Sequence, residues 1–161
     1  MMVTLMVQPI VLVNPLDRLQ LQFKMHWRYP LAIPKLVPIA REEGYHTDQI
    51  GQFTEGQYLG FVFFLEPHQQ RLVSVLHLFD MSGKHTSSNA WDSTDGVDPG
   101  AELANAISAL PKPKPGDAMI APFAVEFFGT TFGMIAVDDD RIDYQPYGLA
   151  FFPPWNGFCE T

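Results

Sequence analysis

Residues 57–66 constrain the fold more than any other segment of this chain. In an extended strand, one face of the segment carries only apolar side chains: Leu59, Phe61, Phe63 and Leu65. The opposite face is also rich in them: Tyr58, Val62 and Phe64. A strand with two apolar faces lies inside a sheet that is covered on both sides. The chain must therefore supply one packing layer above this strand and another below it.

The surrounding sequence predicts an antiparallel sheet built from hairpins. Residues 71–80 and 84–91 read as strands joined by a turn with Asp80 first and Gly83 last. A second hairpin is predicted between residues 119–128 and 131–137, with Gly129-Thr130 as its two-residue turn. We expect one face of its first strand to be apolar: Met119, Ala121, Phe123, Val125 and Phe127. Shorter extended patterns lie at 36–40, 49–53, 141–147 and 149–152. The sheet should contain about seven to nine strands.

One helix is predicted, near residues 99–110. Asp98 suits the N-cap position and Pro99 the first helical position. An apolar stripe recurs at helical spacing: Leu103, Ala106, Ile107 and Leu110. Pro111 then ends the helix, because proline has no N–H to continue the ladder. One amphipathic helix with a mostly antiparallel sheet predicts the α+β class.

The chain divides by pattern into an appendage and a domain. Residues 1–34 read as an N-terminal β-rich appendage or extension, and residues 35–161 as a single α+β domain. The apolar stretch at residues 1–13 lacks the basic start and the cleavage site of a signal peptide, and it is too short to span a bilayer. We therefore expect no targeting segment and no membrane association.

Charge excludes several classes of partner. The net charge is −8, and it is unevenly distributed, because residues 1–35 contain four basic side chains and one acidic one. The remaining residues contain six basic and seventeen acidic side chains. An acidic surface repels the nucleic-acid backbone, which is bound through clustered Lys and Arg. We therefore expect no direct nucleic-acid binding.

The sequence contains no catalytic motif that we recognise. Its one cysteine, Cys159, cannot form an internal disulfide, which suits a reducing cytoplasmic setting. Ser87-Ser88 lacks the G-x-S-x-G context of a hydrolase, and no Walker or dinucleotide-binding loop is present. Asp138-Asp139-Asp140 lacks the Gly and the terminal Glu of an EF-hand loop, so it reads as a solvated turn. No catalytic residue, cofactor or metal site is predicted.

The histidines on either side of the Asp80–Gly83 turn form the strongest candidate site. A hairpin would bring His77 and His85 close together, and with Asp80 they would form an acid–base or metal-binding cluster. In the alternative interpretation, His77 is a hydrogen-bonded strand residue and His85 is exposed. Trp91 and Trp155 complete the candidate binding residues, because aromatic side chains favour interfaces.

Several short segments also carry a resemblance to a known family: Ile39-Ala40-Arg41-Glu42, Tyr45-His46-Thr47, Ile50-Gly51-Gln52-Phe53, Gly56-Gln57-Tyr58, Val75-Leu76-His77-Leu78-Phe79-Asp80, Gly83-Lys84-His85, Trp91, Pro154-Trp155-Asn156-Gly157 and Glu160-Thr161. Through them, residues 35–161 resemble a bacterial family labelled formate-hydrogenlyase regulatory protein. The resemblance implies transcriptional regulation of hydrogenase genes and brings no catalytic residues with it. An acidic domain without a basic recognition helix is a poor DNA binder, so such regulation would act through a protein partner.

These observations predict a cytoplasmic, non-enzymatic binding or regulatory module that acts through protein–protein contacts. One alternative is an immunity-type protein that masks a basic toxin, with acidic charge steering the association. A second is a small-molecule binder or enzyme with its site near His77, Asp80 and His85. A third is a structural subunit whose N-terminal strands, within residues 3–13, exchange with a neighbour.

Overall fold

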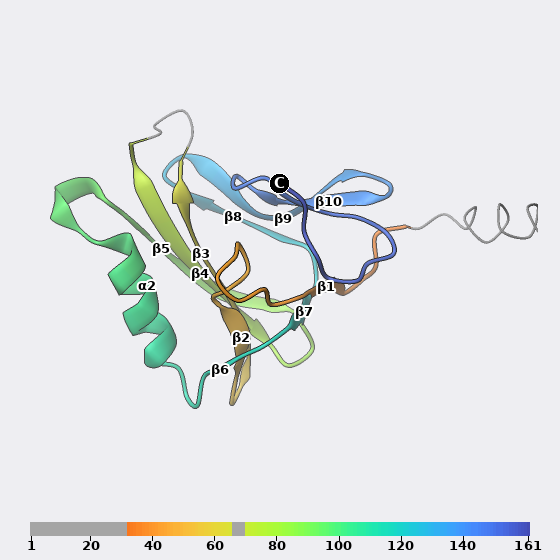
Figure 1. Ribbon diagram of the computed structural model, residues 1–161, viewed down its shortest axis with the longest axis horizontal. Coiled ribbons are helices and arrows are strands. Elements are labelled where there is room, and N and C mark those ends of the chain that lie inside the picture. Colours follow the sequence, from red (N-terminus) through yellow and green to blue (C-terminus); the bar gives the residue numbers. More distant parts are fainter. Residues whose placement is uncertain (1–31, 66–69) are drawn as a thin grey trace, which may run out of the picture. The chain divides into compact units, whose positions relative to one another are not determined.

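The computed structural model describes residues 32–65 and 70–161 (Figure 1). The predicted appendage at residues 1–34 therefore lies almost entirely outside the described residues, as does Glu66. Within the described part, Ile33 already packs against the main apolar core.

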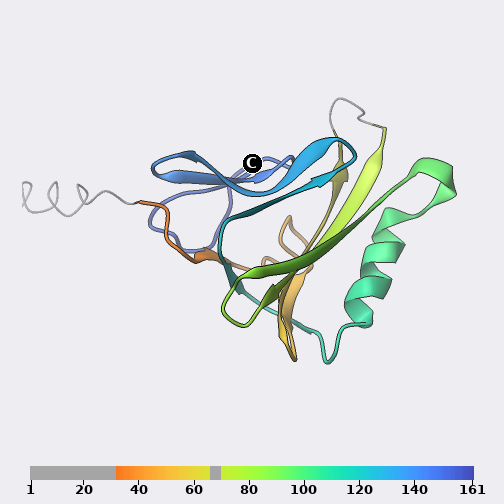
Figure 2. The ribbon, with the colours of Figure 1, turned by 180° about the vertical axis from the view of Figure 1, so that it is seen from behind.

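A five-stranded antiparallel sheet forms the centre of the domain (Figures 1 and 2). Its strands follow the spatial order β5 (His85–Asp92), β4 (Leu72–Asp80), β3 (Gly56–Phe64), β2 (Ile50–Phe53) and β6 (Lys114–Pro115). The central strand is β3, which comes from the segment with two apolar faces. Leu59, Phe61 and Phe63 point into the main core, whereas Tyr58 and Val62 belong to a second apolar cluster. The prediction of a covered central strand is therefore confirmed.

A second antiparallel sheet covers one face of the first sheet. It contains β11 (Leu149–Phe151), β10 (Arg141–Gln145), β9 (Thr130–Asp138) and β8 (Phe123–Phe127) in that spatial order. A separate two-stranded ribbon pairs β1 (Val37–Ile39) with β7 (Ala118–Ile120). Apolar side chains from all three sheets meet in the main core, among them Val37, Phe61, Phe132, Ile142 and Phe151.

Helix α2 (Pro99–Ser108) covers the other face of the five-stranded sheet (Figure 1). The carboxylate of Asp98 accepts a hydrogen bond of 3.2 Å from the Ala101 N–H, as expected for the N-cap, and Pro99 opens the helix. The helix lies close to β3 because Gly60 has no side chain. A Cβ at Gly60 would stand 3.2 Å from Leu103 Cδ1 and 3.3 Å from Ile107 Cδ1. A short 3₁₀ turn, η1 (Thr94–Gly96), precedes the helix.

The α+β class and the antiparallel hairpins are confirmed, but the predicted strand count was too low. The described residues form eleven strands in three sheets. The predicted strand at residues 119–128 is two strands, β7 and β8, which belong to different sheets. Pro122 lies between them and cannot donate to a ladder, so the chain leaves one sheet there and enters the next. The segment that follows the helix also contains the short strand β6, which the sequence did not predict.

The break at Pro122 also changes which side chains are buried. Ala118 and Ile120 are buried in the core, whereas Met119 is exposed, so the single apolar face expected from Met119 to Phe127 does not exist. The turn of the second hairpin is displaced by one residue as well. Phe127 pairs with Thr130, so the two turn residues are Phe128 and Gly129, with φ angles of 54° and 72°. Two positive φ angles are the pattern of a type I′ turn.

Candidate functional site

Four polar side chains form a continuous hydrogen-bonded chain between the two large sheets. The Tyr144 hydroxyl lies 2.8 Å from His77 Nε2, and His77 Nδ1 lies 2.6 Å from Ser88 Oγ. Ser88 Oγ in turn lies 2.7 Å from His85 Nε2. Tyr144 and His77 are fully buried, whereas Ser88 and His85 are partly exposed. We call these four residues the relay, because they link the core to the surface.

A β-bulge brings the relay together. Side chains alternate along a strand, so residues 85 and 88 should lie on opposite faces of β5. The register shifts within the β4–β5 pair, where Leu78 faces Ser87 but Phe79 faces His85. Thr86 is therefore the extra residue, and the phase of β5 changes at that point. As a result His85 and Ser88 lie on the same face as His77.

Phe123 of β8 closes the relay from the second sheet. Its ring stacks on His85 with 4.8 Å between centroids and meets the edge of His77 at 4.7 Å. His77 and His85 are themselves separated by 6.3 Å between ring centroids. The relay and this aromatic contact thus tie the edge strand β5 to the second sheet.

Each buried polar atom of the relay needs a hydrogen-bond partner, and this requirement sets which atoms donate and which accept. Within the described residues, the buried Tyr144 hydroxyl has His77 Nε2 as its only partner. It must therefore donate to Nε2, because a buried donor without an acceptor is costly. His77 is then protonated at Nδ1 and donates to Ser88, and Ser88 donates to His85 Nε2. Every polar atom of the relay core is satisfied in this arrangement.

Burial keeps both histidines neutral. Desolvation is the main cause that lowers the pKa of His77 from 6.5 to about 3, and repulsion from His85, when His85 is protonated, is the lesser cause. Desolvation also lowers the pKa of His85, while a hydrogen bond to the Ser87 backbone opposes this shift. A neutral His77 is what the relay requires, because the imidazolium ion has no acceptor for the Tyr144 hydroxyl.

The structure brings His77 and His85 together but leaves Asp80 outside the relay. Asp80 is half-buried, and its Oδ1 accepts hydrogen bonds from the Ser82 N–H at 2.9 Å and the Lys84 N–H at 3.0 Å. Hydrogen bonds from Ser82 and Lys84 lower the pKa of the Asp80 carboxyl. Asp80 therefore holds the turn between β4 and β5 in shape.

The two candidate tryptophans lie in different parts of the core. Trp91 packs against the second apolar cluster under α2, whereas Trp155 packs against the main core. No hydrogen bond or aromatic contact joins either of them to the relay within the described residues. Among the described residues, Trp155 Nε1 is also the one buried side-chain nitrogen or oxygen atom that lacks a hydrogen-bond partner.

The structure also contains a cleft of about 280 Å³. Five segments line it: β1 and the residue after it, β2, β3, the β7 region and the C-terminal loop. Its polar side chains are Gln52, Gln57, Asp117 and Asn156. Gln57 is fully engaged, since its amide donates to the Met119 carbonyl at 3.0 Å and accepts from the Met119 N–H at 2.7 Å.

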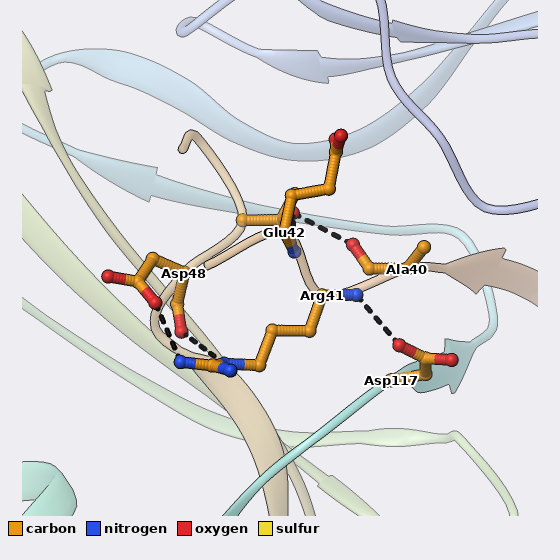
Figure 3. A network of polar contacts seen from close by, with 6 residues as sticks. Ala40, Arg41, Glu42, Asp48 and Asp117 are labelled. Carbon is orange, nitrogen blue, oxygen red and sulfur yellow. Dashed lines mark hydrogen bonds and ion pairs between the residues drawn. The ribbon is translucent and has the colours of Figure 1, made fainter. Parts of the chain in front are cut away.

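A polar network beside the cleft positions Asp117 (Figure 3). Asp117 Oδ1 accepts a hydrogen bond of 2.8 Å from the backbone N–H of Arg41. The Arg41 guanidinium points elsewhere and binds Asp48, with 2.7 Å between Nη2 and Oδ1 and 2.9 Å between Nε and the Asp48 carbonyl. Asp117 is therefore held in place by a neutral donor, and no ion pair offsets its charge within the described residues.

The described residues carry a strong excess of acidic side chains. Sixteen Asp and Glu side chains lie in this part of the chain against seven Lys and Arg. Each of its arginines is bound to an aspartate: Arg41 to Asp48, Arg71 to Asp92 and Arg141 to Asp143. Thirteen carboxylates then remain against four lysines. The described residues include no helix long and apolar enough to cross a membrane and no group of three or more potential metal-binding side chains.

Comparison with known proteins adds no assignment, because no protein-family model, curated protein or solved structure matches the chain. The pattern of the sequence identified two residues of the relay and missed Ser88 and Tyr144. Ser88 was missed because the bulge places His85 and Ser88 on one face of β5, against the alternation that the sequence predicts. Tyr144 was missed because it is 67 positions from His77 in the sequence. The cleft was also missed, and the open carboxamide and carboxylate groups around it have no local signature.

Proposed function

We propose that this domain is a cytoplasmic, non-enzymatic binding and regulatory module that acts through contacts with a basic protein. The observation that supports the proposal is the surplus of sixteen Asp and Glu side chains over seven Lys and Arg in the described residues. Because all three described arginines are also bound to aspartates, the surface field is that of a polyanion. Such a field attracts a basic partner and accelerates the encounter between the two proteins.

The same charge weighs against direct binding to nucleic acid. Binding to a phosphate backbone releases counterions only where several Lys or Arg side chains gather on one surface. In the described part all three arginines are bound to carboxylates, and four lysines remain: Lys35, Lys84, Lys112 and Lys114. Regulation by this domain would thus proceed through the protein that it captures.

An immunity-type role is a special case of this proposal. In that case the basic partner is a toxin, and the acidic domain masks the toxin's active surface. The identity of the captured protein separates the two roles. A captured toxin would lose its activity on binding, whereas a captured regulator would act differently on the molecules that it controls.

The relay supports a second candidate function, in which Ser88 is a nucleophile. Its hydroxyl donates toward His85 Nε2 at 2.7 Å, which is the contact between a serine and its general base. A fluorophosphonate probe tests this candidate directly. Covalent labelling of wild type, and none of Ser88→Ala, would support a hydrolytic site, while an unlabelled wild type would remove it.

Affinity capture from a lysate of the native host tests the main proposal. We expect one defined basic protein at about 50 mM salt and its release at about 300 mM, because added salt screens surface charge. Nuclease treatment excludes capture through nucleic acid, and an unrelated bait of equal negative charge controls for bulk charge. The purified partner should then bind the purified chain with the same salt dependence. If no protein is specific to this bait at low salt, the proposal is wrong.

A further inference from the structure

The cleft combines a fixed negative charge with free hydrogen-bonding groups. Asp117 Oδ1 is bound to the Arg41 N–H, but no hydrogen bond reaches the second carboxylate oxygen within the described residues. Gln52 makes no side-chain hydrogen bond there either. Asn156 uses only its oxygen, which accepts from the Phe158 N–H at 3.2 Å. A carboxylate and two carboxamides therefore have bonding capacity to offer to a ligand.

The walls of the cleft suit an aliphatic chain. Pro38, Ile39, Ala118 and Met119 line it beside the polar groups. Met119 is 48% exposed, although its backbone is anchored at both atoms by Gln57. The volume of about 280 Å³ lies just below the range for ligand pockets, about 300 to 1,000 Å³. One extended side chain matches this size better than a large cofactor.

Charge in the cleft favours a cation over an anion. Asp117 is the only charged residue among those that line it. The nearest cation by strand register is Lys114, which faces Gln52 across the β2–β6 ladder but does not line the cleft. Arg41 cannot neutralise Asp117, because its guanidinium is committed to Asp48 (Figure 3). An anionic ligand would meet the Asp117 carboxylate without a compensating charge.

We propose that this cleft is an anchor pocket for an arginine or lysine side chain of the basic protein partner. The cationic head binds the free oxygen of Asp117, and the side-chain oxygens of Gln52 and Asn156 accept its remaining hydrogen bonds. The Asn156 oxygen does so through the lone pair that the Phe158 N–H does not use. The aliphatic stem lies along Met119 and Ile39. This inference rests on the proposed function. The overall negative charge attracts any basic protein, whereas the pocket would make a specific contact with one side chain of the partner.

The test uses the full chain and two small probes that differ by one charge. N-acetyl-arginine amide carries the guanidinium, and N-acetyl-citrulline amide replaces it with a neutral urea of the same shape. Amide shifts are followed by NMR during titration. We expect the arginine probe to move the signals of cleft residues such as Ala118, Met119 and Gly157, and the citrulline probe to move them little. Equal responses to the two probes, or no response to either, would overturn the pocket.

Asp117→Asn is the decisive variant, because an asparagine oxygen still accepts the hydrogen bond from the Arg41 N–H. Only the charge is lost, so folding should be preserved, which a thermal melt would verify. We expect the affinity for the arginine probe to fall by about fivefold to tenfold, as for loss of a charge-assisted hydrogen bond. Asp95→Asn is the matched control. It removes an equal charge from an exposed turn before α2 and should change the affinity by less than about twofold.

Failure of the pocket and failure of the proposed function give different results. If Asp117→Asn and Asp95→Asn capture the basic protein equally well, the anchor pocket is wrong, while the binding function stands. If the arginine probe binds at the cleft but no basic protein is captured, the binding function is wrong and the pocket serves a free small cation.

Discussion

The relay and the cleft occupy the same face of the same sheet, yet their polar groups differ in one decisive respect. Gln57 of the cleft faces Phe79 across the β3–β4 ladder, and Phe79 points into the main core beside His77. In the relay, the buried polar atoms all have protein partners, from the Tyr144 hydroxyl through both ring nitrogens of His77 to Ser88 Oγ. In the cleft, Gln52 and the second oxygen of Asp117 have none within the described residues.

This difference separates a polar group that stabilises the fold from one that is free to bind. A closed network in a dry core contributes to stability, because breaking it leaves buried atoms without partners. An exposed carboxylate that is held in position but not neutralised contributes little to stability. It is instead ready to meet a cation without reorganisation. We therefore expect variants of the relay to change stability and variants of the cleft to change binding.

Replacement of His77 should have the largest effect. In His77→Ala the imidazole volume becomes a cavity, and both Tyr144 and Ser88 lose a partner. We expect the free energy of unfolding to fall by about 3 to 5 kcal/mol, measured by chemical denaturation. Gln52→Ala in the cleft is the control and should cost less than about 0.5 kcal/mol. Similar losses from both variants would break the comparison.

Acid should destabilise the protein through the relay. The pKa of His77 is about 3 in the folded state and about 6.5 when unfolded, so between these values only the unfolded chain takes up the proton. The stability contributed by neutral His77 is thus complete above pH 6.5 and is lost as the pH falls toward 3. We expect a loss of about 2 kcal/mol between about pH 7 and about pH 5, measured by denaturation at each pH.

A His77→Gln variant provides the control for the pH series. It has no proton to take up at this position, so the part of the slope that comes from His77 should disappear. His85, whose pKa desolvation also lowers, leaves a smaller slope of the same sign. Depressed carboxyl pKa values, such as those of Asp80 and Asp92, affect stability only at lower pH and do not enter this window. If wild type and variant lose stability in parallel, His77 is not the group that responds.

Removal of one hydroxyl should have an intermediate effect. Tyr144→Phe keeps the ring and its contact with Phe61, whose centroid lies 4.2 Å away, but leaves His77 Nε2 buried without a donor. We expect a loss of about 1 to 3 kcal/mol. Tyr147→Phe is a matched control, because the Tyr147 hydroxyl also binds a histidine, His46 Nδ1 at 2.7 Å, in a half-exposed place. A larger loss in Tyr147→Phe would contradict the importance of burial.

Asp117→Asn should have the smallest effect on stability. The asparagine oxygen retains the hydrogen bond from Arg41, and the lost charge has no partner in the described fold. The free energy of unfolding should change by less than about 0.5 kcal/mol, although binding of the arginine probe weakens. A change in the thermal melt as large as that of Tyr144→Phe would show that Asp117 is structural, and the contrast between relay and cleft would fail.

Local pattern was enough to predict several elements of this fold. Asp98 and Pro99 mark the helix start. The Asp98 carboxylate accepts a hydrogen bond from a backbone N–H of the first turn, and Pro99 has no N–H that needs an acceptor. Asp80 and Gly83 mark the first hairpin turn, where Gly83 has a φ of 85°. Prediction failed at Pro122, where the strand pattern continues in sequence while the chain passes between two sheets.

By itself the sequence determined the class of the fold and the sign of its surface charge. Two apolar faces on β3 cannot both face water, so a layer on each side was required whatever its identity. Only the tertiary structure decided which polar groups have hydrogen-bond partners within the protein and which are free to bind a ligand. Both the relay and the cleft join distant segments through register, and in β5 a one-residue bulge reverses the faces of the strand. Register is set by the closure of whole sheets, so no short window of sequence contains it.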